Sequence, residues 1–352
     1  MTGTIFRMNP STNRLTRLHW ATLLIGIAVV CMGVRWSWMQ ANDEQAKKIM
    51  SVENQGGVNG SRHLEEFIDI GSVEADLVIP KLKTGNAGPG ERIKEVVPEF
   101  ANTTAYHVTY LPVDWEPGKS FPVIFEYAGN GGYRNEIGDV CTGVVEDSKL
   151  GFGISGGQGF IWVCLPFLND TGAKNSITWW GDPVAFDPQP TIDYCQRAVP
   201  MICEKYGGDP DRVLLTGFSR GAIACNFIGL HDDEISKLWK GFVPYSHYDG
   251  VSNFGLPGLD RESALSRLKR VGNRPQFICA ESGPGKHTID ATKAYLDSTG
   301  VEGDFTFRET GFRNHNDSWI LRPSPAREEL RTWVKSVLKQ TSQHLAPETR
   351  KE

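Results

Sequence analysis

A length of 352 residues allows one large domain or two small ones, and either can bury a substantial core. A net charge of −5, a pI near 6.0 and the lack of a dense Lys/Arg stretch argue against nucleic acid as a partner. The sequence has no Cys-x-x-Cys pair, His-Glu-x-x-His helix or Walker loop, so we expect neither a metal nor an organic cofactor.

The first 40 residues have the pattern of a secretory signal. Three arginines come without an acidic residue, and an apolar run follows from 21 to 34. Counting residues 18–39 gives the about 20 residues that a spanning helix needs, with Arg35 near one end. Residues 1–40 therefore predict a signal peptide or an uncleaved signal anchor. In both cases we expect the rest of the chain outside the cytoplasm, periplasmic or secreted, and in the second case membrane-anchored through residues 18–39.

Residues 41–90 are polar and contain several glycines, which predicts a linker or a loosely packed extension. Strand and helix patterns alternate over residues 91–345, and residues 346–352 form a short tail. This alternation predicts an α/β fold, a doubly wound and mostly parallel sheet flanked by helices. The expected strands are 92–97, 105–112, 121–127, 160–165, 212–216, 241–245, 275–280 and 304–309, and the expected helices are 191–206, 261–270, 288–298 and 326–338.

Two loops in the first half of this region carry candidate binding groups. A glycine-rich turn, residues 128–132, follows the strand 121–127 directly. The polar loop 169–190 contains the adjacent pair Trp179 and Trp180. Two neighbouring tryptophans in a polar loop are either a platform on which a sugar or aryl group stacks or anchors of the core.

The stretch 212–224 predicts a buried strand, an abrupt turn with the sequence Gly-Phe-Ser-Arg-Gly, and the first turns of a helix. Gly217 and Gly221 lack a Cβ, so strand and helix can pass close together with Ser219 strained at the tip. The N–H of Arg220 then points to where an oxyanion would form, near a helix N-terminus whose dipole favours negative charge. This pattern predicts a catalytic serine.

A serine hydroxyl is a poor nucleophile at neutral pH, so it needs a neighbouring base. In folds built on this kind of turn, the order along the chain is serine, acid, histidine. Of the five histidines after Ser219, only His315 lies in the loop after the final predicted strand, 304–309. We therefore expect His315 to be the base.

The acid that orients His315 has two main candidates, and Asp290, which falls in the expected helix 288–298, is a weaker third one. Glu281 directly follows the strand 275–280, and the loops after adjacent parallel strands are near neighbours because such strands lie about 4.8 Å apart. Asp249 follows the preceding strand, 241–245, from which some hydrolases take their acid. We expect Glu281, with Asp249 as the alternative.

These motifs give the region from about 91 to 340 a resemblance to the esterase group of the α/β-hydrolase superfamily. Within that group it resembles polyhydroxybutyrate-depolymerase-like and feruloyl-esterase-like proteins. The sequences that carry the resemblance are Gly208-Asp-Pro-Asp-Arg212, Gly217-Phe-Ser-Arg-Gly221 and Asn314-His-Asn-Asp317.

The resemblance also implies an oxyanion hole. A second amide is implied in the turn Asn130–Gly131, because these enzymes place it in the loop after the third strand. The pair Ser219-Arg220 is similar to the elbow of glucuronoyl esterases, which implies an oxyanion role for the side chain of Arg220 as well.

Together these features predict an exported serine hydrolase that cleaves carboxylic esters through an acyl-enzyme. The two tryptophans and the export pattern favour acyl groups on carbohydrate, so the expected partner is a small or polysaccharide-linked ester. A peptidase on the same fold is one alternative. A non-catalytic binding protein that has lost its acid is another, and the presence of a carboxylate within hydrogen-bond reach of His315 discriminates against it.

Overall fold

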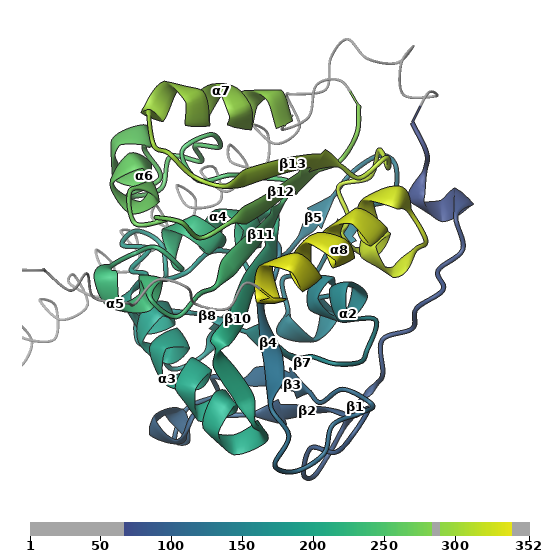
Figure 1. The fold of residues 1–352 in the computed structure, drawn as a ribbon. Coiled ribbons are helices and arrows are strands. Elements are labelled where there is room, and N and C mark those ends of the chain that lie inside the picture. The colour runs from purple at the N-terminus through teal and green to yellow at the C-terminus, as the bar shows by residue number, and fades with distance from the viewer. Residues whose placement is uncertain (1–66, 284–288, 340–352) are drawn as a thin grey trace, which may run out of the picture. The chain divides into compact units, whose positions relative to one another are not determined.

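Residues 67–283 and 289–339 are described by the computed structural model of the protein (Figure 1). The predicted signal, residues 1–40, and the predicted tail, residues 346–352, lie outside these ranges. Within the described ranges, no helix combines the length and the apolar character needed to cross a membrane.

A nine-stranded sheet forms the centre of the described part and confirms the prediction of a doubly wound, mostly parallel sheet. Of its nine strands, only β3 runs antiparallel to its neighbours, which are β2 on one side and β7 on the other. The strands in their order across the sheet are β1 (Leu82–Lys83), β2 (Arg92–Glu95), β3 (His107–Tyr110), β7 (Ile161–Leu165), β4 (Phe121–Tyr127), β10 (Gly208–Phe218), β11 (Gly241–Tyr245), β12 (Gln276–Ala280) and β13 (Phe305–Glu309).

Two small antiparallel pairs lie beside this sheet, β5 with β6 and β8 with β9. Helices cover both faces of the large sheet, α2 and α8 on one face and α3 and α4 on the other (Figure 1). The smaller strands are β5 (Tyr133–Arg134), β6 (Val140–Cys141), β8 (Phe167–Leu168) and β9 (Asn175–Ser176). The α-helices are α2 (Leu150–Ser155), α3 (Gln189–Tyr206), α4 (Arg220–Phe227), α5 (Asp233–Ser236), α6 (Arg261–Leu268), α7 (Ile289–Thr299) and α8 (Pro325–Lys339). The 3-10 helices are η2 (Ile70–Ser72), η3 (Pro98–Phe100), η4 (Val145–Asp147) and η5 (Asp317–Leu321).

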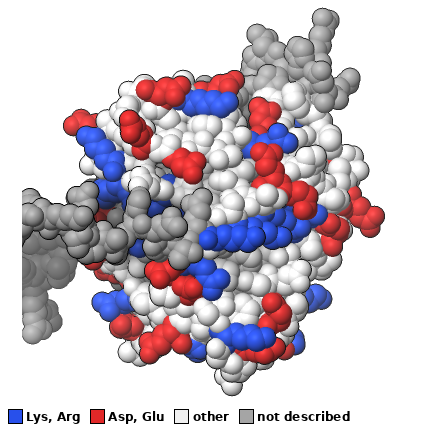
Figure 2. All heavy atoms as spheres, viewed as in Figure 1, with Lys and Arg blue, Asp and Glu red and all other residues white. Residues whose placement is uncertain are grey.

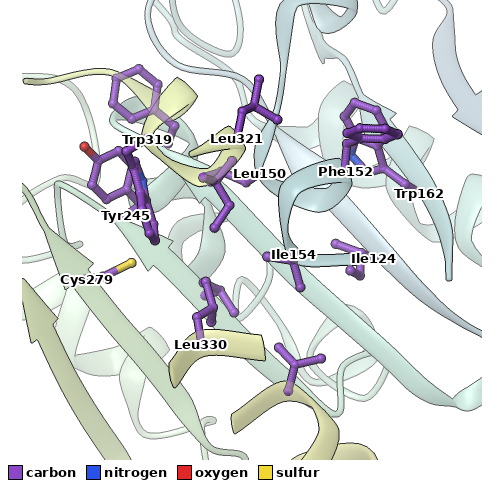
Figure 3. Close-up of a cluster of buried hydrophobic side chains, with 14 of the residues drawn as sticks. Ile124, Leu150, Phe152, Ile154, Trp162, Tyr245, Cys279, Trp319, Leu321 and Leu330 are labelled. Atoms are coloured by element: carbon purple, nitrogen blue, oxygen red, sulfur yellow. The ribbon is translucent and has the colours of Figure 1, made fainter. Parts of the chain in front are cut away.

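A hydrophobic core fills the space between the central strands and the helices α2 and α8. Tyr245 at the end of β11 packs against Trp319 in η5, with the two rings 5.6 Å apart. Leu150 of α2 and Leu330 of α8 are fully buried in the same cluster (Figure 3). Because η5 follows directly on the loop of His315, this packing fixes one end of that loop.

The helix α2 forms from a glycine-rich segment, because its glycines have a packing role. The sequence Leu-Gly-Phe-Gly-Ile-Ser has the composition of a turn, yet both glycines lie at close helix contacts. A Cβ on Gly151 would lie 2.1 Å from the indole of Trp162, and a Cβ on Gly153 would lie 2.4 Å from Ile320. Only glycine lets the backbone of α2 approach the sheet and η5 this closely.

Residues 67–79 form a strap along the domain, whereas the sequence predicts a linker or loosely packed extension over 41–90. Asp69 accepts two hydrogen bonds from the guanidinium of Arg313, at 2.6 and 2.9 Å. The backbone N–H of Ile70 donates to Oδ1 of Asn314 at 2.7 Å. These partners lie about 244 positions away in the chain, so local composition carries no sign of them. The described part of the predicted linker therefore belongs to the folded domain.

The face that carries α8 has basic and acidic side chains interspersed rather than gathered by sign (Figure 2). Several of them pair, for example Arg308 with Glu329 at 3.0 Å and Arg331 with Glu328 at 3.3 Å. Exposed pairs of this kind contribute about 0–1 kcal/mol each. Surface ion pairs of this kind therefore contribute little to the stability of the fold.

Glu126 on β4 is a buried carboxyl that joins β4 to α2 and β7. Its Oε1 accepts hydrogen bonds from the backbone N–H groups of Lys149 and Leu150, at 3.1 and 3.0 Å. Its Oε2 accepts from the N–H of Gly151 at 2.8 Å and from the indole of Trp162 at 2.7 Å. Burial raises the pKa of Glu126 to about 7, although these N–H groups act in the opposite direction. The side chain thus satisfies the free N–H groups at the start of α2.

Replacing Glu126 by leucine is expected to lower the free energy of unfolding by at least about 3 kcal/mol, because four buried N–H donors lose their acceptor at about 1–3 kcal/mol each. Equilibrium urea denaturation measures the change. Glu116→Leu is the matched control, since the side chain of Glu116 is exposed. Equal midpoints for the two variants would contradict this role of Glu126.

Candidate active site

The turn between β10 and α4 holds Ser219 in a strained conformation. Ser219 has φ 53° and ψ −114°, which places it in the left-handed region that L-residues with a Cβ rarely adopt. A Cβ on Gly217 would lie 2.1 Å from the carbonyl oxygen of Gly221, and one on Gly221 would lie 2.0 Å from the carbonyl oxygen of Tyr127. The two glycines of the motif therefore permit the close crossing of strand and helix that aims Ser219 out of the sheet.

Ser219, His315 and Glu281 form a continuous hydrogen-bonded chain. The Oγ of Ser219 lies 3.1 Å from Nε2 of His315, and Nδ1 of His315 lies 2.7 Å from Oε1 of Glu281. Exposed fractions of 3%, 6% and 2% show that all three groups are shielded from solvent. They follow the ends of β10, β13 and β12 respectively, so parallel strand ends bring them together.

Asp249 does not reach His315, and the alternative assignment of the acid to it is wrong. Its two carboxylate oxygens accept hydrogen bonds from Nε and Nη2 of Arg267 on α6, at 2.8 and 2.9 Å. Burial raises the pKa of Asp249, against the opposing effect of Arg267. Asp249 thus belongs to a buried ion pair that holds α6 in place.

The expected oxyanion donors have different surroundings. The N–H of Gly131 donates to the carbonyl of Ile177 at 2.6 Å, so the expectation of an oxyanion role for Gly131 is wrong. Over the described ranges, neither the N–H of Asn130 nor that of Arg220 has a hydrogen-bond acceptor. These two N–H groups are the ones left to bind an oxyanion, one from the loop after β4 and one from the first turn of α4.

The side chain of Arg220 is fully buried and lacks a carboxylate partner among the described residues. Its Nη2 donates to the carbonyl of Gly129 at 2.8 Å, and its guanidinium lies 4.0 Å from the ring centre of Phe167. Nε and Nη1 have no hydrogen-bond partner in the described ranges. Burial lowers the pKa of Arg220 to about 9. The carbonyl of Gly129 and the N–H of Asn130 belong to the same planar peptide group, so the bond from Arg220 also fixes the direction of that N–H.

The two tryptophans are buried, so they do not form an exposed stacking platform. Trp180 is fully buried with its ring stacked 4.2 Å from that of Phe227, and Trp179 packs 5.1 Å from Phe254. The apolar surface of indole is better accommodated in the core than in a polar loop. The ring of Phe254 lies 5.7 Å from that of His247, so Trp179 contacts His247 indirectly, through Phe254.

Two aromatic rings and a second histidine surround His315, and no sequence motif predicts a role for them. The rings of Tyr133 and Phe218 lie at 4.8 Å from the imidazole, and that of His247 lies at 5.3 Å. Phe218 precedes the nucleophile and His247 follows the end of β11 by two positions. The positions of Phe218 and His247 near predicted strand ends were the only sequence feature that could have indicated a place in the site. Tyr133 does not lie near such a strand end.

Asp139 is a buried carboxylate that holds the histidine loop. It accepts hydrogen bonds from the backbone N–H of His315 at 3.0 Å and from Nδ2 of Asn314 at 2.9 Å. Asp139 lies in the turn between β5 and β6, and a third bond, from Nδ2 of Asn135 in the same turn at 2.8 Å, fixes its side chain there. Because Oδ1 of Asn314 binds Ile70 of the strap, the histidine loop is held from both sides. No sequence motif surrounds Asp139, so its role was not predictable.

No protein-family model matches the chain, and no curated protein matches it. Among solved structures, the chain is similar to an S-formylglutathione hydrolase from Agrobacterium tumefaciens, with 13% identity, a TM-score of 0.48, and coverage of 70% of this chain and 93% of that one. It is also similar to the AtxE2 isopeptidase, with 14% identity, a TM-score of 0.45, and coverage of 73% of this chain and 41% of that one. The corresponding values for dipeptidyl peptidase 4 from Porphyromonas gingivalis are 14% identity, a TM-score of 0.44, and coverage of 70% of this chain and 35% of that one. The chain thus spans less than half the length of the two peptidases, and its activity has to be argued from the site itself.

Replacing Glu281 or Asp249 by its amide is expected to change different properties, kcat in the first case and stability in the second. Glu281→Gln removes the negative charge opposite Nδ1 of His315 and supplies an amide N–H that favours the wrong tautomer of the imidazole, so kcat on an aryl acetate should fall by about 10⁴ with the fold intact. Asp249→Asn leaves Arg267 buried without its partner charge, so the unfolding free energy should fall by about 3–5 kcal/mol while folded protein keeps its kcat. Steady-state kinetics and urea denaturation of both variants test the assignment. A collapse of kcat in Asp249→Asn, with Glu281→Gln near wild type, would reverse it.

Proposed function

We propose that this chain is a serine hydrolase that cleaves carboxylic esters through an acyl-enzyme on Ser219. One observation carries the proposal: the Oγ of Ser219 lies 3.1 Å from His315, whose other ring nitrogen lies 2.7 Å from Glu281. A carboxylate within hydrogen-bond reach of His315 is what a degenerate binding protein would lack. The geometry therefore supports an enzyme over the non-catalytic alternative.

The acylation step follows from the proton positions that the hydrogen bonds between Ser219, His315 and Glu281 require. Nε2 of His315 accepts the proton of the Ser219 hydroxyl while Oγ attacks the carbonyl carbon of the ester. Nδ1 carries its proton toward Glu281, whose negative charge stabilises the imidazolium that forms. Nε2 then gives its proton to the leaving alcohol, and the C–O bond of the ester breaks. Water repeats the same steps to release the acid and restore Ser219.

The negative charge of the tetrahedral intermediate needs donors that are in place before the reaction. We assign this role to the N–H groups of Arg220 and Asn130, which have no acceptor in the described ranges. The first belongs to the N-terminus of α4, where the helix dipole adds to the attraction. Loss of one such donor typically costs about 10²–10³ in kcat.

The choice of an ester over an amide rests on the resemblance of the elbow and histidine motifs to esterases. The burial of Trp179 and Trp180 removes their support for carbohydrate-linked acyl groups. We therefore keep the substrate class at carboxylic esters, with carbohydrate esters as one member. Export to the periplasm or the medium, or membrane anchoring, is part of the proposal on the strength of the basic and apolar N-terminus alone.

A fluorophosphonate probe should label the wild type and not Ser219→Ala, because the probe forms a covalent bond only with an activated serine. Ser236→Ala is the matched control: Ser236 is buried on α5 and donates to the carbonyl of Asp233, away from the site. Intact-mass spectrometry measures the labelling. A folded wild type that stays unlabelled would count decisively against a serine hydrolase.

A substrate panel then separates the members of the class. Acetyl, feruloyl and glucuronoyl esters and a peptide amide should be compared by kcat/KM with the same protein. We expect turnover of at least one ester and little or none of the amide. Cleavage of the peptide without turnover of any ester would assign the fold to a peptidase instead.

A further inference from the structure

Ser246 occupies a strained position next to the proposed catalytic residues. It follows the last residue of β11 and is buried, with 4% of its surface exposed. Its φ of 87° lies in the left-handed region, where residues with a Cβ are uncommon. The backbone N–H of Ser246 donates to the carbonyl of Cys279 at 2.8 Å, which anchors this turn to β12. Strain of this kind is found where the surrounding structure holds a residue in place for another purpose.

The hydroxyl of Ser246 touches both members of the His315–Glu281 pair. Its Oγ lies 2.8 Å from Nδ1 of His315 and 3.2 Å from Oε1 of Glu281. A carboxylate only accepts, so the hydroxyl donates its proton to Glu281. Its lone pairs then face Nδ1, which carries a proton in the tautomer that leaves Nε2 open toward Ser219.

We propose that Ser246 is a positioning residue that fixes the tautomer and the orientation of His315. The hydroxyl is a second donor to the buried carboxylate of Glu281, so it favours the charged form of that group. The lone pairs toward Nδ1 favour a proton on that nitrogen and add to the stabilisation of the imidazolium during attack. The inference rests on the proposed serine-hydrolase function. It adds Ser246 as a fourth side chain to the hydrogen-bonded chain of Ser219, His315 and Glu281.

The backbone conformation makes this assignment testable separately from stability. Glycine adopts a φ of 87° without strain, so stability alone would favour glycine at this position. Serine at 246 provides the hydroxyl and retains the strain. Removing the hydroxyl and relieving the strain in one substitution should therefore reduce activity without reducing stability.

Ser246→Gly is expected to lower kcat on an aryl acetate by about 10- to 100-fold, less than the loss of an orienting carboxylate. KM should stay within about twofold, because loss of an interaction that acts on the transition state changes kcat rather than KM. The melting temperature should equal or exceed that of the wild type. Ser246→Ala should show the same loss of kcat with the strain retained, and Ser236→Ala, which is outside the site, should keep the wild-type kcat.

Three results would overturn the inference while the wild type is active. They are a wild-type kcat in both Ser246 variants, a loss confined to KM, and a melting temperature of Ser246→Gly below that of Ser246→Ala. A wild type that neither turns over esters nor reacts with a fluorophosphonate would instead refute the proposed function, and the inference with it. Fluorophosphonate labelling of the same preparations distinguishes the two kinds of failure.

Discussion

The close crossing of β10 and α4 at Ser219 is the constraint on which the rest of the site depends. A Cβ at Gly217 or Gly221 would meet backbone oxygen at 2.1 or 2.0 Å, so the crossing tolerates no side chain there. The crossing holds Ser219 in the left-handed region and leaves the N–H of Arg220, the first of α4, without an acceptor in the described ranges. The same crossing thus aims the Ser219 hydroxyl out of the sheet and provides a place for negative charge beside it.

A strained nucleophile is useful only if its partners are held as firmly. The strand ends of β12 and β13 bring Glu281 and His315 to the edge of the sheet, but the loop of His315 needs more support. Asp139 binds that loop from the β5–β6 side and the strap binds it through Asn314 from the other. Two segments that lie far from His315 in the sequence, the strap and the β5–β6 turn, therefore contribute to the position of a single imidazole. Such over-determination is how a fold sustains strained backbone at a functional site.

The features that the sequence predicted are those whose cause is local. The strands 121–127 and 241–245 are found at the expected residues because continuous apolar runs mark buried strands. The elbow was predictable because its glycines and serine are adjacent in the chain. Glu281 and Asp249 both follow strand ends, and their tertiary partners, His315 for Glu281 and Arg267 for Asp249, distinguish the two.

Features whose cause lies far along the chain were not predictable. The strap has the composition of a linker, and its bonds to Arg313 and Asn314 span about 244 positions. The glycines of α2 give no local sign of a helix, because the neighbours that require them, Trp162 and Ile320, come later in the sequence. For the same reason Asp139 carried no signal, and the burial of Trp180 depends on Phe227, which no local pattern relates to it. Tertiary partners decide such cases over local propensity.

The central claim is that Ser219 carries a covalent acyl group during turnover. Acid quenching during hydrolysis of an aryl acetate, followed by intact-mass spectrometry and peptide mapping, tests it most directly. The account predicts one added acetyl group on the peptide that contains Ser219, and none in Ser219→Ala. Turnover with no acyl group on Ser219, or with the group on another residue, would contradict it.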